Sequence, residues 1–386
     1  MKQPPFRHQR GLSLTELMIS LTVGLVISAA AVEIFINSRS TYNAETGLSR
    51  IQENGRFAID HLNREMRHAG NMGCLQDYGN KVSNLLQPPS GPAADLGRPV
   101  EGYEAINTGP GTTITATYSS GWSPTPSGTL FPGTMVPGSD AIVIRYLDYN
   151  RARLVAPDYM DDAQLFADDT AGMQEGDIAI ITNCKRATLF QVTNISGSAP
   201  KFNIVHAMSS MLPGNICSSW GSPSCPGDQA YGADAELGRM VVRAFYIRNN
   251  AAGQPALYQA TLRGGASGAA MQAEELIEGV ENMQILYGVD RDGIGKPDGE
   301  ADTFITAGEV EALPVNRGWP RVVSVRISLL VRSAMGDQQM ETTTDTGSYL
   351  LAGALPTHGV TVMPGARDAQ RRRVFTTTVQ LRNRGL

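Results

Sequence analysis

The sequence is poor in charged and aromatic side chains, which make up 18% and 6% of its 386 residues. It also lacks a basic excess, because 32 Lys and Arg stand against 37 Asp and Glu, a formal net charge of −5. Proteins dedicated to nucleic acid carry a basic excess, so nucleic acid is not the expected partner. A hydrophobic fraction of 41% excludes intrinsic disorder, and a mean hydropathy of −0.17 excludes a protein that crosses the membrane many times.

The motifs of common catalytic sites are missing too. The chain contains no G-x-S-x-G, no H-E-x-x-H and no G-x-x-x-x-G-K-[ST]. Histidine occurs only five times, once in the N-terminal leader. We therefore expect a structural or binding role and no enzymatic activity.

Long apolar runs are absent except for one, from Leu17 to Val32, which comes after the basic residues Lys2, Arg7 and Arg10. A basic stretch before an apolar run is typical of a secretory signal peptide, and Ala29 to Ala31 could supply its cleavage site. Two residues argue against that interpretation. Glu16 lies where the chain would enter the membrane, and Gly11 stands between the basic leader and the apolar run.

The order of basic leader, Gly11, the segment LSLTE and an apolar helix resembles the class III signal of type IV prepilins. The resemblance implies that a prepilin peptidase cuts after Gly11 and that Leu12 becomes the methylated N-terminus. The family usually has Phe at that position, so Leu12 departs slightly, which bears on methylation more than on cleavage. The apolar helix is then kept.

Glu16 has a clear physical role under this resemblance. A carboxylate inside a bilayer costs a few kcal/mol and usually marks a function. In an assembled filament, Glu16 of one subunit would neutralise the Leu12 amino group of a neighbour and set the axial register. The alternative is a glutamate at a helix end that reaches the lipid headgroups.

The basic leader also orients the chain. The positive-inside rule keeps residues 1–11 cytoplasmic and places everything after the helix in the periplasm. Without the leader the chain has 29 basic and 37 acidic residues, a net charge of −8. We expect a single-pass inner-membrane precursor that later joins an extracellular pilus.

Beyond the apolar run the helical pattern continues. One helix is expected from about Leu14 to Arg67, with residues 12–36 in membrane or filament core and residues 37–70 amphipathic. Gly70 and Gly73 should end it. The expected inner face comprises Leu48, Ile51, Ala58, Leu62 and Met66, and the expected charged face comprises Glu45, Arg50, Glu53, Arg56, Asp60, Arg64, Glu65 and Arg67.

The remaining residues, 71–386, indicate a β-rich periplasmic head with a loop-rich part (75–138) and a strand-rich part (139–386). Strands are expected at 141–147, 177–182, 189–193, 240–247 and 321–331, with another near Phe375 to Leu381 and a weak one at 113–118. Regular βαβ alternation is missing, so the sheets should be antiparallel. The expected fold class is α+β, a pilin-like long N-terminal helix packed on a large antiparallel β-rich head.

Particular C-terminal blocks look like the PilW family of type IV pilus minor pilins. They are residues 276–284, residues 287–290, the strand VVSVRISLLVRS and the terminal RRRVFTTTVQLRNR. This resemblance implies a minor pilin that primes pilus assembly at or near the tip. Whether the pilus serves twitching motility, cell adhesion or DNA uptake stays open. Its implied partners are other minor pilins, the major pilin, the prepilin peptidase, the assembly platform and a large tip adhesin.

Two alternatives to that function stay open. A pseudopilin of a type II secretion system has the same kind of N-terminal signal and apolar helix. A membrane-anchored module that binds a surface would use the helix only as an anchor, and it would not be cut at Gly11.

Four cysteines, Cys74, Cys184, Cys217 and Cys225, lie on the side assigned to the periplasm. An even number in an oxidising compartment predicts two disulfides, with three possible pairings. Cys217 and Cys225 flank the loop SSWGSPS, so local closure is expected, which leaves Cys74 with Cys184. Zinc is the alternative, but a single C-x7-C pair without a nearby His has poor ligand spacing.

An acidic run from Asp290 to Asp302 raises the question of calcium, the one cofactor considered. Counted as an EF-hand loop, it offers Asp290, Asp292, the backbone carbonyl of Ile294, and Asp298, with Glu300 and Asp302 straddling the last position. The alternative is an acidic turn after a strand that ends at Tyr287. The basic cluster Arg371, Arg372, Arg373, Arg382 and Arg384 is interpreted as strand-flanking charge and not as a nucleic-acid site.

Overall fold

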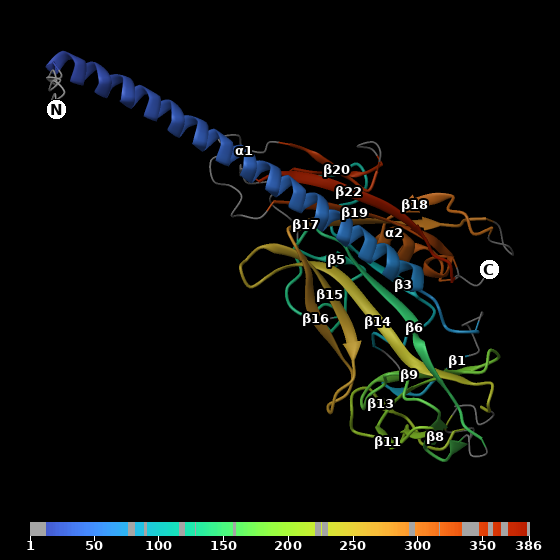
Figure 1. The fold of residues 1–386 in the computed structure, drawn as a ribbon. Coiled ribbons are helices and arrows are strands. Elements are labelled where there is room, and N and C mark those ends of the chain that lie inside the picture. Colours follow the sequence, from blue (N-terminus) through green and yellow to red (C-terminus); the bar gives the residue numbers. More distant parts are fainter. Residues whose placement is uncertain are drawn as a thin grey trace, which may run out of the picture.

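The structure is a computed structural model of the chain. It describes residues 13–75, 82–88, 91–115, 120–127, 129–156, 160–220, 225, 231–292, 298–315, 317–333, 347–353, 358–363 and 370–383. A long helix projects from a body built of β-sheets, and the N-terminal end of this helix lies far from that body (Figure 1).

The long helix, α1, runs from Leu14 to His68 without a break and confirms the expected one. Ser13 caps its N-terminus, and Leu, Ile and Ala dominate its first turns. At the other end the backbone leaves the helical region at Ala69, and Gly70 adopts φ = +76°, a conformation that glycine takes without strain.

The larger sheet has nine strands. Seven form the ordered path β1-β10-β9-β14-β6-β3-β5, and β15 and β16 extend it from β14. Every pair is antiparallel except β1 with β10. The strands are β1 (Val82–Asn84), β3 (Val100–Ala105), β5 (Trp122–Ser123), β6 (Ala141–Arg153), β9 (Ile178–Thr182), β10 (Ala187–Gln191), β14 (Glu236–Asn249), β15 (Pro255–Arg263) and β16 (Ala270–Glu278).

The second sheet lies under the helix. Its order is β18 (Thr303–Ile305), β17 (Val280–Val289), β19 (Val322–Arg332) and β22 (Arg372–Gln380), and all pairs are antiparallel. A short helix α2 (Ala307–Ala312) and a 3-10 turn η1 (Trp319–Arg321) fill the connection between β18 and β19. The helix α1 crosses β22 and β19 and also reaches β16 and β6 (Figure 1).

Three smaller sheets complete the head. One contains β11 (Asn194–Ser198), β12 (Lys201–Val205), β8 (Gln164–Ala167) and β7 (Met160–Asp161). The others pair β13 (Gly214–Asn215) with β2 (Leu86–Gln87), and β20 (Tyr349–Leu351) with β21 (Val360–Val362) and β4 (Thr113–Ile114). The weak strand expected at 113–118 is present at Thr113–Ile114, and residues 116–118 lie outside the described part of the chain.

The helix and the two large sheets share one hydrophobic core. Ile51, Leu62 and Met66 of α1 pack in it with strand residues such as Phe245 and Ile327. Buried carboxyl oxygens of Asp140 join the sheets, because they accept hydrogen bonds from the backbone N–H groups of Ala105 (2.9 Å) in β3 and Ile285 (2.8 Å) in β17. Burial raises the pKa of Asp140 well above its usual range. The head is thus one packed unit around the helix.

Two details of the expected helix faces are wrong. Leu48, assigned to the inner face, is 37% exposed, whereas Glu65, assigned to the charged face, is only 8% exposed. The hairpin β15–β16 was also not expected, because its connection and second strand, GGASGAAMQAEE, are rich in small and acidic residues that resemble a loop. Packing against α1 and β14 stabilises these strands despite their weak intrinsic preference.

His206 and His61 have structural roles in the packing of the head. His206 is buried in an aromatic cluster, stacked on Trp220 with ring centroids 4.0 Å apart and edge-on to Phe190. Burial lowers the pKa of His206 to about 4, so the ring is neutral at neutral pH. On the helix, His61 Nε2 hydrogen-bonds Gln259 Oε1 of β15 (2.9 Å).

Candidate assembly helix and acidic loop

The first half of α1 is apolar and uncovered. Every residue from Ser13 to Arg39 is exposed, including thirteen large apolar side chains between Leu14 and Ile36. Within the described part of the chain, α1 is the one helix that is long and apolar enough to cross a membrane. Because burying each such side chain gains about 1.5–3 kcal/mol, this surface requires lipid or neighbouring apolar helices.

Glu16 closes a capping box at the start of this helix. Its carboxylate accepts hydrogen bonds from the backbone N–H of Ser13 (3.1 Å) and from the Ser13 hydroxyl (3.2 Å). In return, the Ser13 hydroxyl oxygen accepts a hydrogen bond from the backbone N–H of Glu16 (3.2 Å). The carboxylate thus lies at the positive end of the helix dipole and at the N-terminal tip of the apolar surface.

The role of Ser13 was missed from the sequence. The signal was present, since Ser-Leu-Thr-Glu before an apolar run is a capping-box pattern. The processing residues Gly11 and Leu12 lie outside the described residues, so cleavage after Gly11 and methylation of Leu12 stay predictions.

The second half of α1 is held on the head by close contacts with β22. At Gly55 the helix has no room for a side chain, because a Cβ atom there would lie 2.2 Å from Cε2 of Phe375. Further along the helix, Thr377 donates a hydrogen bond from its hydroxyl to Asn63 Oδ1 (3.0 Å). These contacts fix the distance between helix and sheet.

A partly buried ion pair fixes the rotation of α1 about its own axis. Arg243 of β14 pairs through Nη1 with the Oε1 atom of Glu65, and the Tyr146 hydroxyl of β6 donates to Glu65 Oε2 (3.2 Å). Burial raises the pKa of the Tyr146 hydroxyl, which therefore stays a donor. A charge pair with little water around it is sensitive to geometry, so it favours one orientation of the helix.

Two disulfides secure the head in the structure. Cys74, just after α1, is bonded to Cys184 in the connection between β9 and β10, with Cα atoms 4.8 Å apart. Cys217 is bonded to Cys225, with Cα atoms 5.7 Å apart. This is the pairing inferred from the sequence, and the first bond joins the end of the helix to the larger sheet across 110 positions of sequence.

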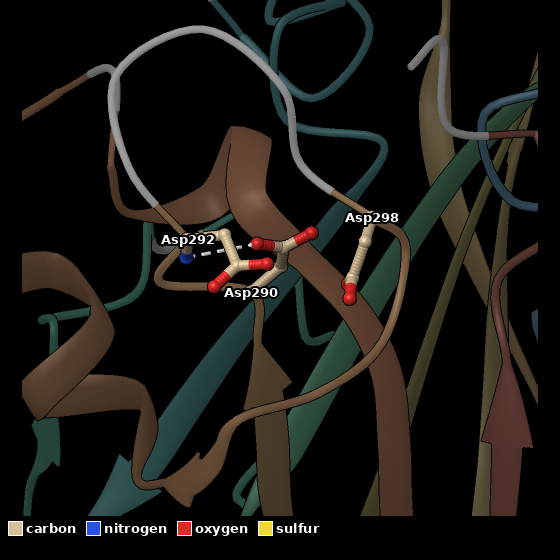
Figure 2. A group of neighbouring side chains, drawn as sticks. All are labelled: Asp290, Asp292 and Asp298. Atoms are coloured by element: carbon tan, nitrogen blue, oxygen red, sulfur yellow. Dashed lines mark hydrogen bonds between the residues drawn. The ribbon is translucent and has the colours of Figure 1, made fainter.

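Three of the six predicted calcium ligands lie together. Figure 2 shows Asp290, Asp292 and Asp298 facing one another, and one oxygen of each lies within 4.8 Å of the others. That spread is about twice a Ca²⁺–oxygen distance, so a single ion could touch all three. Asp290 is buried, whereas Asp292 and Asp298 are exposed.

Of the other three predicted ligands, Ile294 lies outside the described residues, and Glu300 and Asp302 are not part of this group. Glu300 and Asp302 are exposed, and one carboxylate oxygen of Asp302 already accepts a hydrogen bond from the backbone N–H of Arg291 (2.6 Å). Both oxygens of Asp290 also accept backbone hydrogen bonds, from Asp292 (3.1 Å) and Gly299 (3.0 Å), as expected of an acidic turn.

Repulsion between carboxylates within the loop makes it possible to distinguish a calcium site from an acidic turn by experiment. Asp302 and then Asp298 raise the pKa of Asp292. A carboxyl group whose pKa is raised on folding stabilises the folded state at low pH, where it is protonated. That stability is lost as the pH rises through the raised pKa. At neutral pH Asp292 is therefore ionised and is repelled by its acidic neighbours. If Ca²⁺ binds, a concentration a hundredfold above its Kd should raise the melting temperature by about 5 °C.

The measurement is calorimetry and thermal melting of the full chain in detergent, with and without Ca²⁺. Asp292→Asn should raise the melting temperature without Ca²⁺ and abolish most of the Ca²⁺ response. Asp60→Asn, at an exposed position of α1, is the matched control and should change neither. Absence of heat and of a melting shift would identify the run as an acidic turn.

Two members of the basic cluster near the C-terminus, Arg372 and Arg373, make side-chain contacts within the chain. Arg372 donates from Nε to Glu281 Oε2 (2.6 Å) and from Nη2 to Glu281 Oε1 (3.3 Å), and Arg332 lies 3.6 Å from the same carboxylate. The guanidinium of Arg373 lies over the Phe375 ring at 5.7 Å. Arg384 is outside the described residues. The described contacts agree with charges that flank an edge strand.

Comparison with known proteins gives two family matches. Residues 244–383, from β14 to the end of β22, match the type IV pilus-assembly protein W family (PilW), and residues 6–32 match the prokaryotic N-terminal methylation motif. Searches of curated proteins and of solved structures gave no match. The methylation motif contains Gly11, Leu12 and Glu16, and the PilW match contains both inner strands of the second sheet. The similarity to the PilW family of type IV pilus-assembly proteins thus covers the second sheet and the strands before it, and the start of the chain carries the N-terminal methylation motif.

Proposed function

We propose that the chain is a minor pilin, a structural subunit that helps to prime pilus assembly at or near the pilus tip together with other minor pilins. The observation that carries the proposal is the exposed apolar half of α1 with a carboxylate at its tip, on a chain with the methylation motif and the PilW match. Its role is assembly by packing, and no catalytic step is assigned to any residue.

The apolar half-helix can move between two environments at little cost. In the inner membrane its exposed side chains face lipid, and in a filament they face the helices of other subunits. Both surroundings are apolar, so the hydrophobic contribution is similar in each. Because the hydrophobic contribution is similar in both environments, the prepilin peptidase and the assembly platform can act on a membrane-inserted precursor that later enters the fibre.

Apolar contacts alone would leave the axial position of the helix undefined, because they have little direction. Glu16 supplies the missing direction. Its own capping interaction is worth about 1 kcal/mol, whereas an unpaired carboxylate in apolar surroundings costs a few kcal/mol. Transfer of Glu16 from its own helix end to the Leu12 amino group of a neighbour is therefore favourable at one register only.

The periplasmic head then determines the neighbours. The head is held in one orientation on α1 by the close contact at Gly55, the Glu65–Arg243 pair and the Cys74–Cys184 bond. The position of the helix in the fibre therefore sets the position of the head surface. The surfaces that touch other minor pilins, the major pilin or a large tip adhesin belong to this head.

Mass spectrometry of fibres sheared from the cell surface tests the proposal. We expect the chain at low abundance relative to the major pilin, beginning at Leu12 with a methylated amino group. Deletion of its gene should reduce fibre number. Its presence only in the membrane fraction, with a deletion that blocks protein secretion and leaves pili intact, would favour the pseudopilin alternative. A chain that keeps residues 1–11 would favour a simple anchored binding module.

A further inference from the structure

The strand β16 ends the larger sheet with an open edge. Within the described residues it pairs with β15 alone, and Figure 1 shows it at the margin of the sheet. Near its end, at Glu278, the backbone carbonyl accepts a hydrogen bond from Asn54 Nδ2 of α1 (3.2 Å). Towards its beginning, Ala270 and Gln272 are exposed. Such an edge presents unpaired backbone groups that another extended chain can pair with.

The open edge is negatively charged. Glu274, Glu275 and Glu278 are all exposed, and none of them forms an ion pair with a described Lys or Arg. Glu274 accepts a hydrogen bond from Gln259 Nε2 (2.9 Å). Glu275 accepts one from Asn250 Nδ2 (3.1 Å) and one from the Tyr258 hydroxyl (3.4 Å). Edge charges repel a second copy of the same strand, because like charges directly opposite one another are destabilising. They attract a strand that carries Lys or Arg.

An apolar groove begins where β16 begins. It has a volume of about 500 Å³. Its lining includes Ala270 and Met271 of β16, Leu262 of β15 and Leu212 at its rim. Leu212 is 68% exposed and bridges Gly268, just before β16. A groove of this size accepts more than one apolar side chain.

We propose that the β16 edge and this groove together bind an extended, basic segment of a partner protein by β-strand addition. The segment pairs its backbone with β16, places Lys or Arg beside Glu274 and Glu275, and inserts an apolar side chain at Ala270 and Met271. Charge complementarity selects this occupant, since the acidic edge excludes another β16 and an acidic strand. The surface is separate from the apolar half of α1, so it is tested independently of the pilus proposal.

The test uses the full chain in detergent and a synthetic, fluorescent nine-residue peptide that alternates Lys with Ile and Leu. Fluorescence anisotropy should show saturable binding. Hydrogen exchange should slow at the amides of residues 270–276. Binding should weaken about tenfold with the paired substitution E274Q/E275Q, and at least tenfold with Ala270→Trp, which fills the groove. Glu300→Lys, on an exposed residue in the connection before β18, is the control and should bind as the parent does.

Two further peptides make the test decisive. The same peptide N-methylated at all of its internal backbone amides should lose binding, because neither edge can then donate hydrogen bonds to β16. A peptide with Glu in place of Lys should also fail to bind. Equal binding of either peptide, no saturable binding, or no slowing of exchange in β16 would overturn the proposal. Melting curves of each variant identify those that are unfolded, and for these the peptide comparison decides.

Discussion

Glu16→Ala will remove most surface pili while the chain still inserts in the membrane. The substitution leaves the apolar run unchanged, so insertion and retention of the helix should persist. It removes the carboxylate that we propose pairs with the amine of a neighbouring subunit. That pairing would contribute a few kcal/mol in apolar surroundings, so its loss should reduce assembly more than tenfold. Fibre yield after shearing and membrane fractionation measure the two effects separately.

Two matched variants show whether the effect belongs to the carboxylate at the helix tip. Glu33→Ala removes the other carboxylate of the exposed half of α1 and should leave fibre yield nearly unchanged. Ser13→Ala removes the cap but keeps Glu16, and it should weaken assembly little, because a cap contributes only about 1 kcal/mol. Normal piliation in the Glu16→Ala strain would contradict the assigned role.

Removal of the Cys74–Cys184 disulfide will be the most destabilising change in the head. In the chain-entropy account, a bond across 110 positions contributes about 5 kcal/mol, because it constrains a long loop of the unfolded chain. That is a large part of the usual 5–15 kcal/mol of domain stability. Urea unfolding of the C74S/C184S variant under non-reducing conditions should therefore show a much lower midpoint.

The second disulfide provides the comparison. Cys217 and Cys225 are separated by only 8 positions, for which the same account gives about 2.5 kcal/mol. The C217S/C225S variant should thus lose about half as much stability. An equal or larger loss in that variant would contradict the argument. Peptide mapping under non-reducing conditions that linked Cys74 to Cys217 or Cys225 would contradict the pairing itself.

Local patterns in the sequence predicted the helix well. The capping residue, the apolar run and the three- and four-residue spacing all lie within α1, so its limits at Leu14 and His68 differ from expectation by at most one residue. Strands with strong alternation, such as Val322–Arg332, were likewise found where expected. The hairpin β15–β16 was missed, because its strands are stabilised by their neighbours and carry little local signal.

Contacts between distant segments could not be predicted in the same way. Glu65 looked like a solvent-facing residue, and its burial depends on Arg243 and Tyr146, which are far away in the chain. Gly55 carries no local signal at all, and its importance comes from Phe375, which closes over it from the last strand. The calcium spacing was inferred from one loop, yet among its five described residues only Asp290, Asp292 and Asp298 lie together.

By itself, the sequence determined the N-terminal signal, the long helix and the β-rich character of the head, because each depends on residues close together in the chain. The tertiary structure alone decided how the helix is rotated on the head, which sheet edge stays open and which acids gather beside it. Those features arise from pairings across tens to hundreds of residues, where the free energy comes from packing and charge contacts that no local pattern encodes.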